Sequence, residues 1–299
     1  MNLLKTPDEL TDDLIVLAFA EDIGDGDHTT FSCIPPDATG KSRLLIKDDG
    51  ILAGVVIAQR IIRFFDPHLL IDIFIHDGTE VKKGDVAFTL EGKVRSILQV
   101  ERIVLNVMQR MSGIATVTRR YVKALEGTGT RVLDTRKTTP GMRMLEKEAV
   151  RIGGGLNHRI GLFDMILLKD NHVDFAGGIR QAITSARNYL QENGKYLKIE
   201  IEVRNFDELD EALRTGGVDR IMLDNFTVDD TREAVRRIAG QTQAGPTGNV
   251  VRRIETEASG GITFDNLRDY AACGVDFISV GALTHSVKSL DMSLKAVES

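Results

Sequence analysis

From residue 131 onward, hydrophobic residues occur in short runs separated by amphipathic stretches. Short apolar runs bounded by polar residues or glycine predict buried strands, and apolar residues three or four positions apart predict helices. The expected strands are Arg131–Leu133, Met165–Leu168, Lys198–Val203, Arg220–Leu223, Val251–Glu257 and Asp276–Val280. The expected helices are Ile179–Leu190, Phe206–Arg214, Asp229–Ile238 and Phe264–Ala272. This alternation implies parallel βαβ units, and about six strands instead of eight predict an incomplete α/β barrel.

The first third of the chain has a different pattern. A helix is expected from Thr6 to Ala20, with Thr6 as its N-cap before Pro7. β-like runs and then a long helical stretch follow, at Ser42–Lys47, Leu69–His76, Val81–Leu90 and Ile97–Leu125. Ser112-Gly113 could break that helix, so we expect an N-terminal α/β sandwich domain over residues 1–113 and the barrel over residues 114–299. Residues 241–249 are expected to form a loop.

Composition excludes several classes of protein. Hydrophobic residues make up 42% of the 299 residues and charged residues 27%, as in ordinary globular proteins. The net charge of −6 gives no reason to expect nucleic acid or an anionic membrane as a partner. Cys33 and Cys273 are the two cysteines, and without paired spacing they predict neither a zinc site nor a disulfide framework. Neither a signal peptide nor a membrane span is expected, so the expected location is the cytoplasm.

Positive charge is nevertheless concentrated at strand ends. Arg136-Lys137 follow the first expected strand, His158-Arg159 follow a triple glycine, and Lys169 follows Met165–Leu168. Such residues could be solvated surface charges, or Lys169 could form a Schiff base, as strand-end lysines of barrel enzymes do. An arginine fork suits a carboxylate, and a lysine suits a phosphate. The clustering therefore favours a site for several anionic groups.

Acidic and glycine-rich segments complete this expected site. Glu200 and Glu202 alternate with apolar residues, so they share one strand face, and Asp224 ends the next strand. Carboxylates there could hold ribose hydroxyls and Mg²⁺, whereas Glu200 is expected in an internal salt bridge. Backbone N–H groups before the helix expected at Phe264, and again after the last strand, could cradle phosphate; these residues are Ser259, Gly260, Gly261 and Gly281.

Five motifs in order resemble the quinolinate phosphoribosyltransferases, also called nicotinate-nucleotide pyrophosphorylases (carboxylating). They are DTRKTTPG from Asp134, NHR from Asn157, LLKDNH around Lys169, MLDNF around Asp224 and EASGGI around Ser259. The resemblance extends from about Asp22 to Leu283. It implies a homodimeric enzyme that converts quinolinate and 5-phosphoribosyl-1-diphosphate to nicotinate mononucleotide, diphosphate and CO₂ with Mg²⁺, in de novo NAD biosynthesis.

The resemblance also implies a role for each residue. The quinolinate-binding residues would be Arg102, Arg136, His158, Arg159 and Lys169, with Arg102 reaching the partner's site. The donor-binding residues would be Lys137, Glu202, Asp224, Ser259, Gly260, Gly261, Gly281 and His285. Of these, Lys137, Glu202 and Asp224 would be catalytic, and Glu202 and Asp224 would bind the metal, directly or through water.

Other functions remain open at this point. A related phosphoribosyltransferase could act on nicotinate or another small acid, although a single carboxylate would leave cations unmatched. A Lys169 Schiff-base aldolase is an alternative from another reaction class. A non-catalytic phosphate-binding module would not need the full set of acidic and basic residues.

Overall fold

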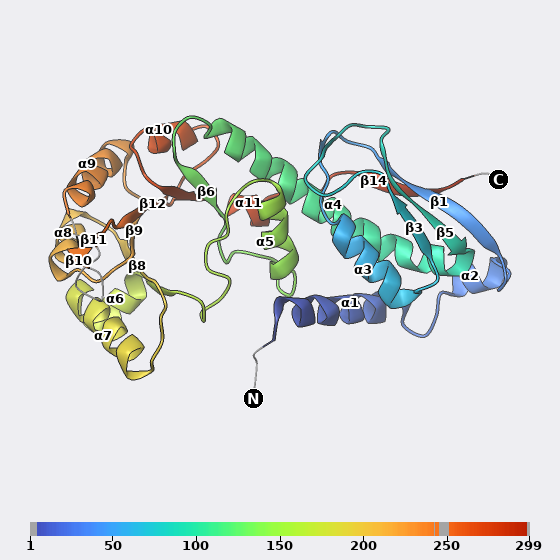
Figure 1. Ribbon diagram of the computed structural model, residues 1–299, viewed down its shortest axis with the longest axis horizontal. Helices are drawn as coiled ribbons and strands as arrows, with labels where there is room; N and C mark the ends of the chain where they lie inside the picture. Colours follow the sequence, from blue (N-terminus) through green and yellow to red (C-terminus); the bar gives the residue numbers. More distant parts are fainter. Residues whose placement is uncertain (1–4, 242, 245–250, 298–299) are drawn as a thin grey trace. The chain divides into compact units, whose positions relative to one another are not determined.

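The computed structural model describes residues 5–241, 243–244 and 251–297 (Figure 1). The chain forms two compact units, each assembled from separate segments. Unit 1 consists of Met1–Arg120, Lys137–Gly155 and Ala282–Ser299. Unit 2 consists of Tyr121–Arg136 and Leu156–Gly281. The chain therefore passes between the units several times.

Unit 1 combines helices with a four-stranded antiparallel sheet of order β14-β1-β5-β3. Its first segment contains α1 (Pro7–Ile23), α2 (His28–Cys33), β1 (Thr39–Ile46), β2 (Gly50–Ile51), α3 (Val55–Phe65), β3 (Leu70–Ile73), β4 (Glu80–Val81), β5 (Val86–Lys93) and most of α4 (Val94–Ala124), whose last four residues belong to unit 2. The later segments add α5 (Arg143–Ile152), α11 (Ala282–His285) and β14 (Met292–Ala296).

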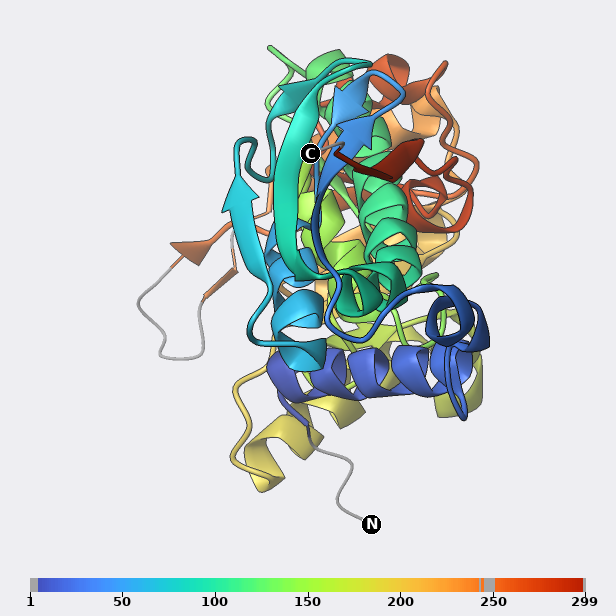
Figure 2. The same ribbon diagram turned by 90° about the vertical axis from the view of Figure 1, so that its right-hand side faces the viewer.

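One hydrophobic core joins the helices of unit 1 to its sheet. It contains Ile15 of α1, Ile62 of α3 and Met108 of α4 together with Leu44 and Phe88 of the sheet. Figure 2 shows the sheet with α3 and α4 beside it. Burial of one helical stripe against one sheet face is the arrangement of a two-layer α/β sandwich, so this prediction is confirmed.

Local signals in unit 1 account for some element bounds but not others. Thr6 caps α1 as predicted: the Glu9 N–H donates to Thr6 Oγ1, and the Thr6 N–H donates to the Glu9 carboxylate. The break expected at Ser112-Gly113 is wrong, because α4 is one continuous helix. A Cβ on Gly113 would lie 2.3 Å from the Lys288 carbonyl oxygen, so the glycine permits close backbone packing there.

Unit 2 contains a six-stranded parallel sheet of order β6-β13-β12-β9-β8-β7. Its strands are β6 (Arg131–Leu133), β7 (Ile166–Leu168), β8 (Ile199–Val203), β9 (Arg220–Asp224), β12 (Glu255–Ser259) and β13 (Phe277–Ser279). The helices are α6 (Asp170–Ala176), α7 (Ile179–Glu192), α8 (Phe206–Thr215), α9 (Val228–Ala239) and α10 (Leu267–Ala271). β10 (Gln243–Ala244) and β11 (Val251–Arg252) form a separate pair.

The two faces of the parallel sheet differ in polarity. Ile201, Val203 and Ile221 pack in one core with α7, α8 and α9, which cover the outer face of the sheet (Figure 1). The alternate positions of β8 carry Glu200 and Glu202, and those of the neighbouring β9 carry Arg220, Met222 and Asp224. Because side chains alternate across a strand, the polar set faces away from these helices.

The sheet confirms the predicted incomplete barrel: β6 and β7 are its edge strands, and they do not pair in the part of the chain described. One strand prediction needs correction. The run expected over residues 251–257 divides into β11 and β12, and β12 continues to Ser259. Most of the loop expected at 241–249 lies outside the described residues. Within the described ranges, every helix is too short or too polar to cross a membrane.

Candidate active site

The carboxyl ends of adjacent strands in unit 2 bring most of the expected site residues to one edge of the sheet. Lys169 follows β7, and Glu202 lies near the end of the neighbouring β8. Asp224 ends β9, and its register partner Ser259 ends β12. Strand pairing therefore orders these four residues across the sheet, at the edge where α/β barrels place their active sites.

Lys169 and Glu202 form an ion pair, with 2.7 Å between Lys169 Nζ and Glu202 Oε2. The Lys169 side chain is 45% exposed, whereas that of Glu202 is nearly buried, so the pair lies at the rim of the polar face. The ion pair places Lys169 at the rim of the site, where its partly exposed side chain can also contact a ligand.

Asn225 joins the loops that follow β9 and β12, and the sequence analysis did not assign it a role. Its N–H donates to the Ser259 carbonyl at 2.9 Å, and its Nδ2 donates to Asp224 Oδ2 at 2.7 Å. Among the described residues, Asn225 is the one non-glycine residue with positive φ, at 56°. A Cβ on Gly260 would lie 2.3 Å from Asn225 Oδ1. The asparagine of the MLDNF motif could have indicated this, because Asn tolerates left-handed backbone.

Arg136 and Arg159 lie close enough to influence each other electrostatically. Burial, together with the positive charge of Arg136, lowers the pKa of Arg159. Arg159 Nη1 donates to the Met165 carbonyl at 3.3 Å. Two arginines held together in a partly buried place repel each other, and a ligand with more than one carboxylate would relieve that repulsion.

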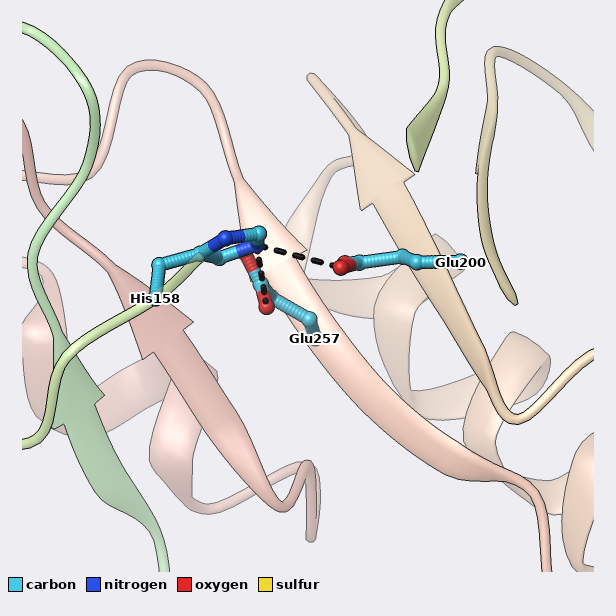
Figure 3. Close-up of side chains that lie close together, drawn as sticks. All are labelled: His158, Glu200 and Glu257. Atoms are coloured by element: carbon cyan, nitrogen blue, oxygen red, sulfur yellow. Dashed lines mark ion pairs between the residues drawn. The ribbon is translucent and has the colours of Figure 1, made fainter. Parts of the chain in front are cut away.

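His158 is buried between two glutamates of the sheet (Figure 3). Its Nε2 lies 3.1 Å from Glu200 Oε2 and 3.5 Å from Glu257 Oε2. The Arg159 N–H donates to His158 Nδ1 at 2.7 Å, which leaves Nε2 as the ring nitrogen that faces the carboxylates. The His158 N–H donates to Asp134 Oδ1 at 2.8 Å, which fixes the backbone as well.

Arg220 supplies a cation to the same glutamates. Its Nη1 lies 2.9 Å from Glu257 Oε2 and 4.0 Å from Glu200 Oε2. Burial raises the pKa of Glu200 to about 7, and burial with the charge of Glu200 raises the pKa of Glu257 to about 7. Burial opposes ionisation of Arg220, but the carboxylates prevail and raise its pKa. The salt bridge expected for Glu200 is thus present.

His158, Glu200 and Glu257 are also the one group of three possible metal ligands found among the described side chains. Their oxygens and nitrogen converge on a small buried volume. Because Arg220 already lies within 4.0 Å of both glutamate oxygens, a protein cation occupies the role that a metal would have. We therefore assign this cluster to the internal support of the polar face.

The triple glycine before His158 has a packing role. A Cβ on Gly153 would lie 2.6 Å from Thr118 Cβ, and one on Gly155 would lie 2.8 Å from Thr118 Cγ2. Gly154 has φ of 95°, where side chains are strained. These glycines let the segment after α5 lie directly against α4 within unit 1.

Three of the expected site residues belong to unit 1. Arg102 is exposed on α4, and Lys137 is exposed at the start of the segment that leads to α5. His285 ends α11, with 2.7 Å between its Nδ1 and Ser286 Oγ. The other expected site residues, Arg136 among them, belong to unit 2.

Glu202, which is also paired with Lys169, and Asp224 are the residues of this edge that could hold Mg²⁺ together with a phosphorylated ligand. They lie on one face of adjacent strands, with Glu202 in register with Met222 and Asp224 two residues further along. Mg²⁺ is usually held by one or two carboxylates, with phosphate oxygens and water completing its coordination. These two residues would hold the ion, which would neutralise phosphate charge.

Known proteins match this chain over nearly its whole length. Residues 27–112 match the family described as quinolinate phosphoribosyl transferase, N-terminal domain, and residues 114–295 match the corresponding C-terminal domain. The quinolinate phosphoribosyltransferase [decarboxylating] 1b of Nicotiana tabacum is 43% identical over 98% of this chain and 85% of its own length. A probable nicotinate-nucleotide pyrophosphorylase [carboxylating] of Bacillus subtilis is 44% identical over 92% of this chain and 90% of its own.

Solved structures of similar proteins have the same fold. The crystal structure of NadC from Streptococcus pyogenes has a TM-score of 0.87 and 37% identity, and covers 99% of this chain and 100% of its own. The nicotinate-nucleotide pyrophosphorylase of Francisella tularensis has a TM-score of 0.86 and 38% identity, with 98% of each chain covered. The resemblance found in the five motifs is therefore confirmed, and the chain belongs to the quinolinate phosphoribosyltransferase family.

Proposed function

We propose that this protein transfers phosphoribosyl from 5-phosphoribosyl-1-diphosphate to quinolinate, releasing nicotinate mononucleotide, diphosphate and CO₂, a step of NAD biosynthesis. Membership of the family supports the reaction class. The observation that carries the proposal is the ordered set of charged residues along the carboxyl edge of the parallel sheet, with Lys169, Glu202, Asp224 and Ser259 on successive strands.

Quinolinate would be held by the cationic groups. Arg136, Arg159 and Lys169 can pair with its two carboxylates, since arginine forks bind carboxylates through two parallel hydrogen bonds. His158 holds the Arg159 N–H through Nδ1 and so orients the backbone of that arginine. Arg102 of the partner subunit would complete the site.

The phosphoribosyl donor would be held by acidic residues and backbone N–H groups. Glu202 and Asp224 would hold Mg²⁺ and the ribose hydroxyls, and Lys137 and His285 would pair with phosphate. Ser259, Gly260, Gly261 and Gly281 would bind phosphate through their N–H groups. Mg²⁺ would supply positive charge that stabilises the departing diphosphate.

The reaction needs no covalent enzyme nucleophile. The lone pair of the quinolinate ring nitrogen forms the bond to the anomeric carbon, and the electrons of the breaking C–O bond leave with diphosphate. Carboxylates near that carbon would stabilise its developing positive charge. The ring nitrogen is then cationic, so it stabilises the carbanion left on the neighbouring ring carbon when the carboxylate departs as CO₂, and a proton then takes the place of CO₂ on that carbon.

A homodimeric assembly and a cytoplasmic location are part of this proposal. The dimer would provide Arg102 to a neighbouring site. The relatives differ in location, since a Nicotiana glauca relative is named mitochondrial and an Arabidopsis thaliana relative chloroplastic. The Bacillus subtilis relative carries no organelle in its name.

Product analysis tests the proposed reaction. The protein is incubated with quinolinate, 5-phosphoribosyl-1-diphosphate and Mg²⁺, and nicotinate mononucleotide and CO₂ are quantified. Equal amounts of both products are expected, with none when either substrate is omitted.

A parallel reaction with borohydride tests the aldolase alternative, because borohydride reduces a Schiff base to a stable adduct. A covalent adduct on Lys169 without nucleotide formation would support the aldolase instead.

A further inference from the structure

Buried side chains of unit 1 hold the segment that contains Lys137 from two directions. Thr284 Oγ1 of α11 donates to the Lys137 carbonyl at 2.8 Å. Two residues further along, the Thr139 N–H donates to Glu146 Oε2 of α5 at 3.2 Å. The backbone on both sides of Thr138 is therefore anchored to helices that are far apart in the sequence.

Arg110 of α4 connects the two anchors. Its Nη2 and Nε donate to Glu146 Oε1 at 2.8 and 3.1 Å, and Nη2 also donates to the Thr284 carbonyl. Glu146 and Thr284 are fully buried, and the Arg110 side chain is 22% exposed. Arg110, Glu146 and Thr284 thus form one network, which we call the α4–α5–α11 clamp.

Burial of the Glu146 carboxylate in the clamp costs free energy. A buried carboxylate is tolerated only when it is paired and hydrogen-bonded, and here both Glu146 oxygens have partners. A buried polar network with its groups satisfied restricts the backbone to one arrangement. The arrangement that it selects presents Lys137 at the surface and also fixes α11, in which His285 follows Thr284.

We propose that Arg110, Glu146 and Thr284 are positioning residues for the phosphoribosyl donor, which act by holding Lys137 and His285 in their binding geometry. This inference rests on the proposed donor-binding role of those two residues. The clamp residues do not touch the donor. Their effect is transmitted through the Lys137 carbonyl and the end of α11.

Thr284 allows the sharpest test, because two variants separate its hydroxyl from its shape. Thr284→Val keeps the branched side chain without the donor to the Lys137 carbonyl, whereas Thr284→Ser keeps the hydroxyl. One neutral hydrogen bond corresponds to roughly a five- to tenfold change in an equilibrium. We expect Thr284→Val to raise the KM for 5-phosphoribosyl-1-diphosphate by about that factor, with the quinolinate KM within about twofold of wild type and with recovery in Thr284→Ser.

Thr130 provides the matched control. Its buried hydroxyl donates to the Val275 carbonyl at 2.7 Å, at the amino end of β6. Thr130→Val therefore removes the same kind of bond away from the carboxyl edge. Both valine variants should lose thermal stability to a similar extent, but only Thr284→Val should change the donor KM. A donor KM that is unchanged in Thr284→Val, or equally raised in Thr130→Val, would overturn the proposal.

A double-mutant cycle separates this inference from the function on which it rests. Lys137→Ala alone should raise the donor KM; if it does not, the proposed donor site is wrong. If it does, Thr284→Val added to Lys137→Ala should raise the donor KM by less than it does in the wild-type chain, because one of the two residues through which it acts is gone. Fully additive effects of the two substitutions would show that Thr284 acts independently of Lys137, which contradicts the clamp.

Discussion

At the scale of single residues, the polar face of the parallel sheet carries more charge than the reaction itself uses. Glu200, Glu257 and Arg220 surround His158, and none of the first three is expected to contact a substrate. Burying the carboxyl groups of Glu200 and Glu257 costs free energy. The pKa of each glutamate is raised to about 7, first of all by that burial.

These raised pKa values predict a pH dependence of stability. Between about pH 4.5 and 7 the folded state binds more protons at this pair than the unfolded state does, so the free energy of unfolding falls as pH rises through this window. Each proton corresponds to a slope of about 1.4 kcal/mol per pH unit. Glu257→Gln should flatten the decline, measured by denaturant unfolding from pH 5 to 8. Parallel wild-type and variant profiles would contradict this prediction.

Arg136 and Lys137 should serve different ligands although they are neighbours. Arg136→Ala removes a carboxylate fork and should weaken quinolinate binding by about tenfold or more, with a smaller effect on the donor. Lys137→Ala should weaken binding of the phosphoribosyl donor more than binding of quinolinate. Calorimetric titration of each variant with each ligand measures the four affinities. Equal loss of one ligand in both variants would show that the division of roles is wrong.

At the scale of elements, sequence periodicity was sufficient where burial alternates regularly. β6 matches its predicted bounds, and β8 and α7 differ from theirs by one residue and two residues at one end. α5 was not predicted from the sequence. Its buried face includes the charged residues Glu146 and Lys147, so the helix lacks a clear apolar stripe. β14 was not predicted, although Met292 and Leu294 alternate with polar residues in it; its partner β1 lies at the other end of the chain.

Part of the site, like part of the fold, could be predicted from the sequence. Strand ends indicated Lys169, Glu202 and Asp224 directly. The clamp was not predictable, because Glu146 and Thr284 become partners of Arg110 only after residues 36 and 174 positions apart are brought together. The support around His158 is of the same kind, since Glu200 and Glu257 come from different strands.

The loops after β9 and β12 yield a prediction for Asn225. Its φ of 56° is strained for alanine by about 1 kcal/mol or more but is open to glycine. Asn225→Gly should therefore be more stable than Asn225→Ala, although both remove the amide that donates to Asp224. Thermal unfolding gives the ranking, and donor KM values should rise in both. Equal stability of the two variants would argue against backbone strain as the reason for asparagine.

At the scale of the whole molecule, Arg102 raises the question of which subunit completes the site. If it acts in the partner's site, an Arg102→Ala chain and an Asp224→Ala chain can form a mixed dimer with one intact site and one doubly damaged site. Random pairing makes about half of the dimers mixed, so activity should recover to roughly a quarter of wild type. The experiment is co-refolding of equal amounts of the two nearly inactive variants. Mixing that restores nothing would place Arg102 in the site of its own chain.

We expect the cationic groups of this site to be matched to a dicarboxylate. Nicotinate would leave at least one buried cation without its partner, at a cost of about 1–3 kcal/mol, or on the order of tenfold or more in kcat/KM. The most direct measurement compares kcat/KM for quinolinate and nicotinate with the same donor and Mg²⁺, following nicotinate mononucleotide. We expect quinolinate to be preferred by at least about tenfold, with CO₂ released in equal amount. Comparable turnover of the two acids would contradict the account.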